Sequence, residues 1–143
     1  MSLEEFVRRV EKRVREFSWR LVPAPAREWW TKEIERLDDA LNQHHAHAEH
    51  FRDSARRIRT RLAENEVREA VLSSQVETYI HTGEQARAYE LALELDQVRR
   101  QLAEDRARLS CEEKAYRMHR GRIAELHRRL AGVPRKIRPR ASV

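Results

Sequence analysis

Only three glycines and four prolines occur among the 143 residues of this chain, and 38% of its residues are Asp, Glu, Lys or Arg. Strong helix formers are abundant and no stretch alternates apolar and polar residues, which predicts an all-α protein without a sheet. The sequence has no long apolar run and no secretory signal, which predicts a cytoplasmic protein without a membrane span. The single cysteine, Cys111, excludes an internal disulfide, and the net charge of +6 lies mostly at the two chain ends, which suits contact with an anionic surface.

Residues 1–22 predict a short amphipathic helix, because apolar residues recur there every three or four positions between charged ones. The apolar stripe comprises Leu3, Phe6, Val7, Val10, Val14, Phe17 and Leu21, and the basic residues around it include Arg8, Arg9, Lys12 and Arg13. Such a stripe must be covered by a bilayer, by the rest of the protein or by another chain. Trp19 falls nearly opposite the stripe, which argues against Trp19 as the interfacial anchor of a membrane helix and so weighs against the membrane interpretation.

Residues 23–26 predict a joint, because proline lacks a backbone donor and biases the residue before it away from helical angles. A long helix is then expected from about residue 27 to about residue 80. Its seam positions alternate spacings of three and four and are Ile34, Leu37, Leu41, His44, Ala48, Phe51, Ala55, Ile58 and Leu62. Beyond them the apolar residues Val67, Val71, Val76 and Ile80 change phase, which predicts a stutter in the coiled coil.

A turn is expected near residues 81–84, where Gly83 can close the preceding helix in a left-handed conformation or Thr82 can cap the next one with Gln85. A third helix is predicted from about residue 84 to residue 130. Its two seam columns each repeat every seven residues; they are Ala88, Leu95, Leu102, Leu109, Tyr116, Ile123 and Leu130, and Leu91, Val98, Asp105, Glu112, His119 and Leu126.

The short connection requires the two long helices to run antiparallel, so residues 27–130 predict an antiparallel coiled-coil hairpin. Asp105, Glu112 and His119 make the middle of one seam column polar, which either fixes the register or marks a docking position. Gly121 permits close approach of another backbone. Residues 131–143 predict a basic disordered tail.

The sequence shows no catalytic motif and no cofactor motif. It has no glycine-rich phosphate loop, no nucleophile elbow and no concave site around paired carboxylates. The histidines between His44 and His50 offer only two ligands on one helix turn, whereas a structural zinc site uses four, so no metal site is expected. Trp29 and Trp30 are candidates for a partner or assembly contact, or one of them closes the end of the hairpin core.

The order of an amphipathic first helix, a joint at Pro23 and a long hairpin that turns at Thr82-Gly83-Glu84, with Ala86-Arg87-Ala88 after it, resembles the PspA/Vipp family of bacterial phage shock proteins, which are related to ESCRT-III. The resemblance covers residues 3–130. It implies a protein at the inner face of the cell membrane that binds anionic lipid through its first helix, associates with itself through the hairpin and, in some members, restrains a transcriptional activator ATPase. Family members continue into further helices that this sequence does not include.

Three functions of different classes are therefore open. The first is a non-enzymatic envelope-stress protein of the phage shock type, bound peripherally to the membrane. The second is a soluble coiled-coil adaptor or regulator that binds a protein without lipid contact. The third, a nucleic-acid binder, is the weakest, because basic residues on the long helices are interleaved with acids and only the tail is a clean positive run.

Overall fold

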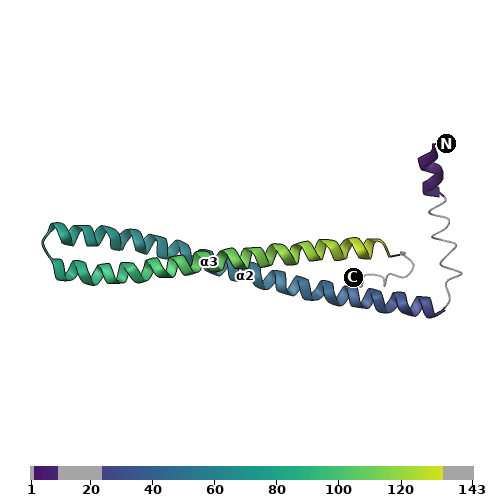
Figure 1. The fold of residues 1–143 in the computed structure, drawn as a ribbon, viewed down its shortest axis with the longest axis horizontal. Helices are drawn as coiled ribbons and strands as arrows, with labels where there is room; N and C mark the ends of the chain where they lie inside the picture. Colours follow the sequence, from purple (N-terminus) through teal and green to yellow (C-terminus); the bar gives the residue numbers. More distant parts are fainter. Residues whose placement is uncertain (1, 10–23, 134–143) are drawn as a thin grey trace. The chain divides into compact units, whose positions relative to one another are not determined.

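A computed structural model describes residues 2–9 and 24–133 of the chain. Within these residues all the regular structure is helical: a segment at residues 3–9, the helix α2 at Ala24–His81 and the helix α3 at Gln85–Ala131. Figure 1 shows α2 and α3 folded back on each other at the turn between them. The predicted all-α class and the helical hairpin are confirmed.

The helix α2 begins earlier than the sequence predicts. Residues 24–26, assigned above to the joint, already belong to its first turn. Proline is compatible with this position, because the first backbone N–H groups of a helix have no intrahelical acceptor and Pro25 removes one of them. Pro23 itself lies outside the described residues.

The turn is built by the end of α2. Gly83 has a φ of 77°, its N–H donates to the carbonyl of Ile80 at 3.2 Å, and the N–H of Glu84 donates to the carbonyl of Tyr79 at 3.0 Å. This pair of bonds is the Schellman motif, which satisfies carbonyls at a helix end and favours glycine. The Thr82 hydroxyl donates back to the carbonyl of Tyr79, so of the two predicted roles for this turn the structure adopts the one centred on Gly83.

The seam predicted for the first half of α2 is confirmed. Six of its nine positions are buried and the other three, Leu41, His44 and Phe51, are half-buried. On α3, every position of the two predicted columns is buried or half-buried. The strict heptad spacing on both helices therefore identifies the faces that meet.

The predicted stutter after Leu62 is wrong. Leu72 is 5% exposed, whereas Val67 and Val71 are 66% and 50% exposed and Ile80 also faces solvent. The heptads of α2 continue without interruption through half-buried or buried Asn65, Glu69, Leu72, Val76 and Tyr79. Asn65 and Glu69 occupy heptad positions but are polar, so a pattern based on apolar residues alone does not include them.

The described chain divides into two compact units. One contains residues 45–121, with a core of Ile58, Leu62, Leu72, Leu95, Val98 and Leu102 against which Leu91 and Leu109 pack. The other contains the described residues before 45 and after 121, where Ile34, Leu37, Ile123, Leu126 and Val133 are buried.

The structure bears on two predictions near the end of α3, the start of the disordered tail and the role of Gly121. Ala131 is helical and Val133 is buried, so these two residues do not belong to a disordered tail. The other residues of the predicted tail, 134–143, lie outside the described residues. A Cβ placed on Gly121 would meet nothing within 4 Å, so no described backbone makes the close approach that this glycine permits.

Candidate functional site

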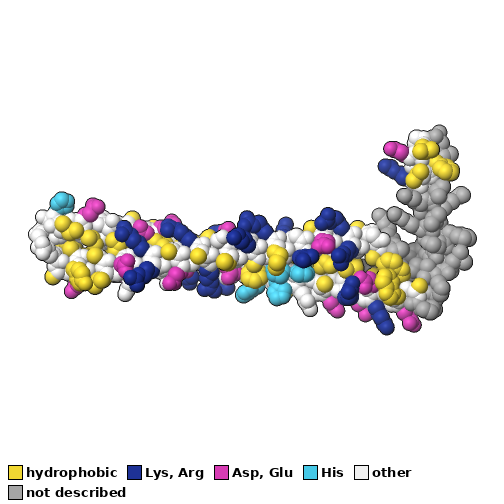
Figure 2. All heavy atoms as spheres, viewed as in Figure 1, with side chains coloured by type: hydrophobic (Ala, Val, Ile, Leu, Met, Phe, Trp, Pro, Cys, Tyr) yellow, Lys and Arg dark blue, Asp and Glu magenta, His cyan; other side chains and the backbone are white. Residues whose placement is uncertain are grey.

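The N-terminal segment, residues 2–9, presents apolar side chains to solvent. Leu3, Phe6 and Val7 are 81%, 56% and 45% exposed, and their spacing of three and four residues places them on one side of the helix. Arg8 and Arg9 follow directly and are also exposed. Figure 2 shows hydrophobic and charged side chains together at this end of the chain.

A capping box starts this helix. The backbone N–H of Glu5 donates to the Ser2 hydroxyl, and the N–H of Ser2 donates to the carboxylate of Glu5, both at 3.3 Å. These reciprocal bonds satisfy two of the backbone donors that a helix start leaves free. The Ser2-x-x-Glu5 spacing is the sequence signal of this capping box.

The structure brings together only part of the predicted membrane-binding set. Leu3, Phe6, Val7, Arg8 and Arg9 share one short helix. The remaining predicted residues lie outside the described residues; they are Val10, Lys12, Arg13, Val14, Phe17 and Leu21.

The tryptophan pair at the start of α2 is divided between two environments. The rings of Trp29 and Trp30 meet edge to face, with centroids 4.9 Å apart and planes at 78°. Trp29 is exposed, whereas Trp30 is half-buried. Trp30 therefore suits the core-closing role, whereas the large aromatic surface of Trp29 stays exposed to solvent.

Asp105 is the most deeply buried charged group of the hairpin, with 2% of its side chain exposed. Arg61 holds both carboxylate oxygens: its Nε donates to Oδ2 at 2.8 Å and an Nη donates to Oδ1 at 2.6 Å. The amide of Gln101 donates to Oδ1 at 3.1 Å. Hydrogen bonds from Arg61 hold the pKa of Asp105 below its ordinary value, although burial acts in the opposite direction.

Glu112 lies one heptad further along the same column. Its Oε1 is 3.8 Å from Nε of Arg108, while its Oε2 is buried and no described group hydrogen-bonds to it. A buried acceptor without a partner costs stability. Among the described residues, the carboxylate of Asp105 therefore has hydrogen-bond partners for both oxygens, whereas Oε2 of Glu112 has none. The sequence alone does not show this difference.

The histidines form an aromatic cluster across the seam. The ring of His119 stacks on His47 at 5.0 Å and on Phe51 at 5.5 Å, and His50 meets Phe51 edge to face at 5.3 Å. Figure 2 shows a group of histidine side chains near the middle of the hairpin, apart from another histidine at the turn. His44 is half-buried in the seam as predicted. Among the described residues, no three potential ligands come together in a way that could hold a metal ion.

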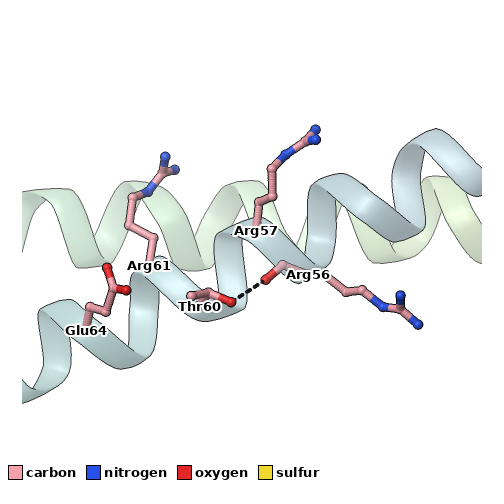
Figure 3. A pocket seen from close by; sticks show the side chains of 5 residues that line it. All are labelled: Arg56, Arg57, Thr60, Arg61 and Glu64. Carbon is pink, nitrogen blue, oxygen red and sulfur yellow. Dashed lines mark hydrogen bonds between the residues drawn. The ribbon is translucent and has the colours of Figure 1, made fainter.

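A shallow hollow lies on the outer surface of α2, lined by Arg56, Arg57, Thr60, Arg61 and Glu64. Figure 3 shows Arg57 and Arg61 projecting from one side of the helix and Arg56 from another, while the Thr60 hydroxyl donates to the carbonyl of Arg56 at 3.1 Å. Arg61 is held by Asp105, whereas no described carboxylate pairs with Arg56 or Arg57. The hollow is thus an exposed basic surface and not an enclosed site.

Within residues 2–9 and 24–133, no helix combines the length and the apolar character that crossing a membrane requires. Cys111 is exposed on α3. Comparison of the chain with family models, curated proteins and solved structures found no match.

Proposed function

We propose that this chain is a non-catalytic coiled-coil protein that binds an anionic membrane surface through its N-terminal segment and associates with itself, or binds a regulator, through its hairpin. The proposed setting is the inner face of the cell membrane during envelope stress, as in the phage shock family that the sequence resembles. A transcriptional activator ATPase is the regulator that the resemblance suggests.

The observation that carries this proposal is the exposed apolar surface of Leu3, Phe6 and Val7 beside Arg8 and Arg9. Burying one such apolar side chain stabilises a bound state by roughly 1.5 to 3 kcal/mol, and a basic residue near an anionic surface adds about 1 kcal/mol. The capping box supports the proposal further, because it favours the helical state that aligns these side chains before binding.

Vesicle flotation tests the proposal. The wild-type chain should float with vesicles of phosphatidylcholine and phosphatidylglycerol at low salt, float less at high salt and float poorly with phosphatidylcholine alone. The double substitution Phe6→Ser and Val7→Ser removes apolar surface without changing charge and should abolish flotation.

A matched control is available near the turn of the hairpin. Tyr89 and Leu93 are exposed apolar residues near the turn, so Tyr89→Ser with Leu93→Ser removes a similar surface from a region not proposed to touch lipid. This control should float like wild type. If wild type does not float, or if the two double variants behave alike, the membrane proposal fails.

A second candidate function is a protein adaptor, favoured by the exposed ring of Trp29. Aromatic residues of this kind often dominate the binding free energy of protein interfaces. The adaptor function would be supported over the membrane function by two results together. The chain would not float with vesicles, and a protein captured by the wild type would not be captured by a Trp29→Ala variant.

A further inference from the structure

Charge is strongly segregated along residues 45–121. The part of the hairpin nearest the turn, residues 62–105, contains ten acidic and four basic residues, and we call it the acidic half. The remaining residues, 45–61 and 106–121, contain ten basic and four acidic residues, and we call them the basic half. The formal charges are therefore −6 and +6, and the buried pair Arg61–Asp105 lies at the boundary.

Ion pairs within the hairpin leave much of this charge uncompensated. In the acidic half, Arg68, Arg99 and Arg100 already pair with acids of the same half. Among the described residues, the acids of this half without an ion pair are Glu64, Glu77, Glu84, Glu90 and Glu104. The corresponding cations of the basic half are Arg56, Arg57, Lys114, Arg117 and Arg120.

The outer face of α2 crosses the boundary between the halves and carries a second stripe with heptad spacing. Its members are all exposed and are Arg57, Thr60, Glu64, Val67, Val71, Ser74 and Thr78. Arg57 and Glu64 stand on either side of Thr60 and have no ion-pair partner among the described residues. Val67 and Val71 add exposed apolar surface to the same stripe.

From this arrangement we propose that two copies of the chain pair antiparallel through this outer face of α2, with the acidic half of each beside the basic half of the other. A twofold axis near Thr60 places Arg57 of each copy opposite Glu64 of its partner, so the favourable contact occurs twice. The pairing rests on the self-association included in the proposed function, and it adds the face, the orientation and the force that selects them.

Charge decides between the possible orientations. Two hairpins aligned parallel and in register would place like charges together along both halves. Two parallel hairpins shifted by half a length would match one half of each and leave the other halves unpaired. Only the antiparallel pair matches both halves of both copies, and charge complementarity of this kind fixes orientation and register.

Sedimentation equilibrium of the full chain without lipid tests the pairing. The wild type should be dimeric at about 50 mM NaCl, and its dissociation constant should rise at least about tenfold at about 500 mM, because salt screens exposed charges. Arg57→Glu alone and Glu64→Arg alone should each weaken the dimer at least about tenfold. An equimolar mixture of these two variants should restore a dimer, since each altered residue then faces an opposite charge.

Two comparisons make the proposal falsifiable. Arg117→Glu changes the same amount of charge on α3, and if it weakens the dimer as much as Arg57→Glu does, the proposed face is wrong. In a Cys111→Ser background, Thr60→Cys should form a disulfide between copies, whereas His81→Cys, at the turn, should not.

A cross-link at position 81 as efficient as that at position 60 would mean a parallel pair and overturn the proposal. So would a protein that stays monomeric at about 100 µM in low salt. Because these measurements contain no lipid, either result leaves the flotation test of the membrane function to be decided separately.

Discussion

Asp105 shows how a charged residue occupies a seam position that leucine holds elsewhere. The carboxylate is almost fully buried, but the guanidinium of Arg61 that holds it is 46% exposed and keeps contact with water. Only one of the two charges therefore loses most of its hydration, which lowers the usual cost of a buried ion pair. Because the bonds join α2 to α3, they also favour one register of the hairpin over its neighbours.

The Asp105 pair predicts an acid-sensitive contribution to stability. The pKa of Asp105 is lower in the folded chain than its ordinary value, so its contribution is fully present above the ordinary aspartate pKa of about 4 and is lost as pH falls through the folded value. Asp105→Asn should lower the unfolding free energy by about 1 to 2 kcal/mol at neutral pH. Urea denaturation of both proteins from neutral to strongly acidic pH measures this difference.

The difference between wild type and Asp105→Asn should shrink toward zero in acid. Arg61→Gln is the matched partner variant, and combining it with Asp105→Asn should add little further destabilisation, since one interaction is lost in both. A difference that stays constant down to the lowest pH would show that the pair does not contribute through its charge.

At the scale of elements, α2 and α3 meet in a seam whose heptad spacing continues beyond Leu62. Half-buried Glu69 belongs to it because the carboxylate reaches the edge of the seam, 3.6 Å from Nε of Arg99 on α3. Polar residues at such positions are tolerated where they find a partner across the pair of helices. The unbroken heptads of α3 thus determine which side of α2 is buried beyond Leu62.

Adjacent residues on α2 test this phase directly. Leu72 is 5% exposed and belongs to the hydrophobic core, whereas Val71 is 50% exposed. Leu72→Ala should lower the unfolding free energy by about 2 to 4 kcal/mol. Val71→Ala should change it by less than about 0.5 kcal/mol under conditions in which the protein is monomeric. Urea denaturation followed by circular dichroism gives both values. A larger loss of unfolding free energy for Val71→Ala than for Leu72→Ala would support the predicted stutter.

At the scale of the whole molecule, α2 packs against α3 of the same chain. A short turn favours this packing, because Gly83 supplies the left-handed conformation that ends α2. An open chain that exchanged its helices with a second copy would bury the same seams but would form a different dimer from the one proposed above.

Cysteines placed across the seam distinguish these two states. In a Cys111→Ser background, Val76→Cys with Leu91→Cys should form a disulfide within one chain, because both side chains lie in the seam near the turn. Electrophoresis without reductant should show a monomer with altered mobility. Covalent dimers in place of this monomer would indicate exchanged helices.

Much of the fold can be predicted from the sequence, but less of the candidate functional site can. Strict spacing from Ile34 to Leu62 and from Ala88 to Leu130 predicts both buried faces, because only those faces collect apolar side chains at every turn. The spacing of Leu3, Phe6 and Val7 likewise predicts an apolar face, but their exposure is known only from the structure. The capping role of Ser2 and Glu5 was also present in the sequence, as a recognisable spacing.

The sequence by itself therefore determined the helical class, the turn at Gly83 and most seam positions, since these depend on local propensity and on the period of the helix. Only the tertiary structure decided the pairing of Arg61 with Asp105, the unsatisfied oxygen of Glu112 and the stacking of His47 and Phe51 on His119. These contacts join residues far apart in the chain. They depend on the register of α2 against α3, a property of the packed pair of helices that neither helix carries alone.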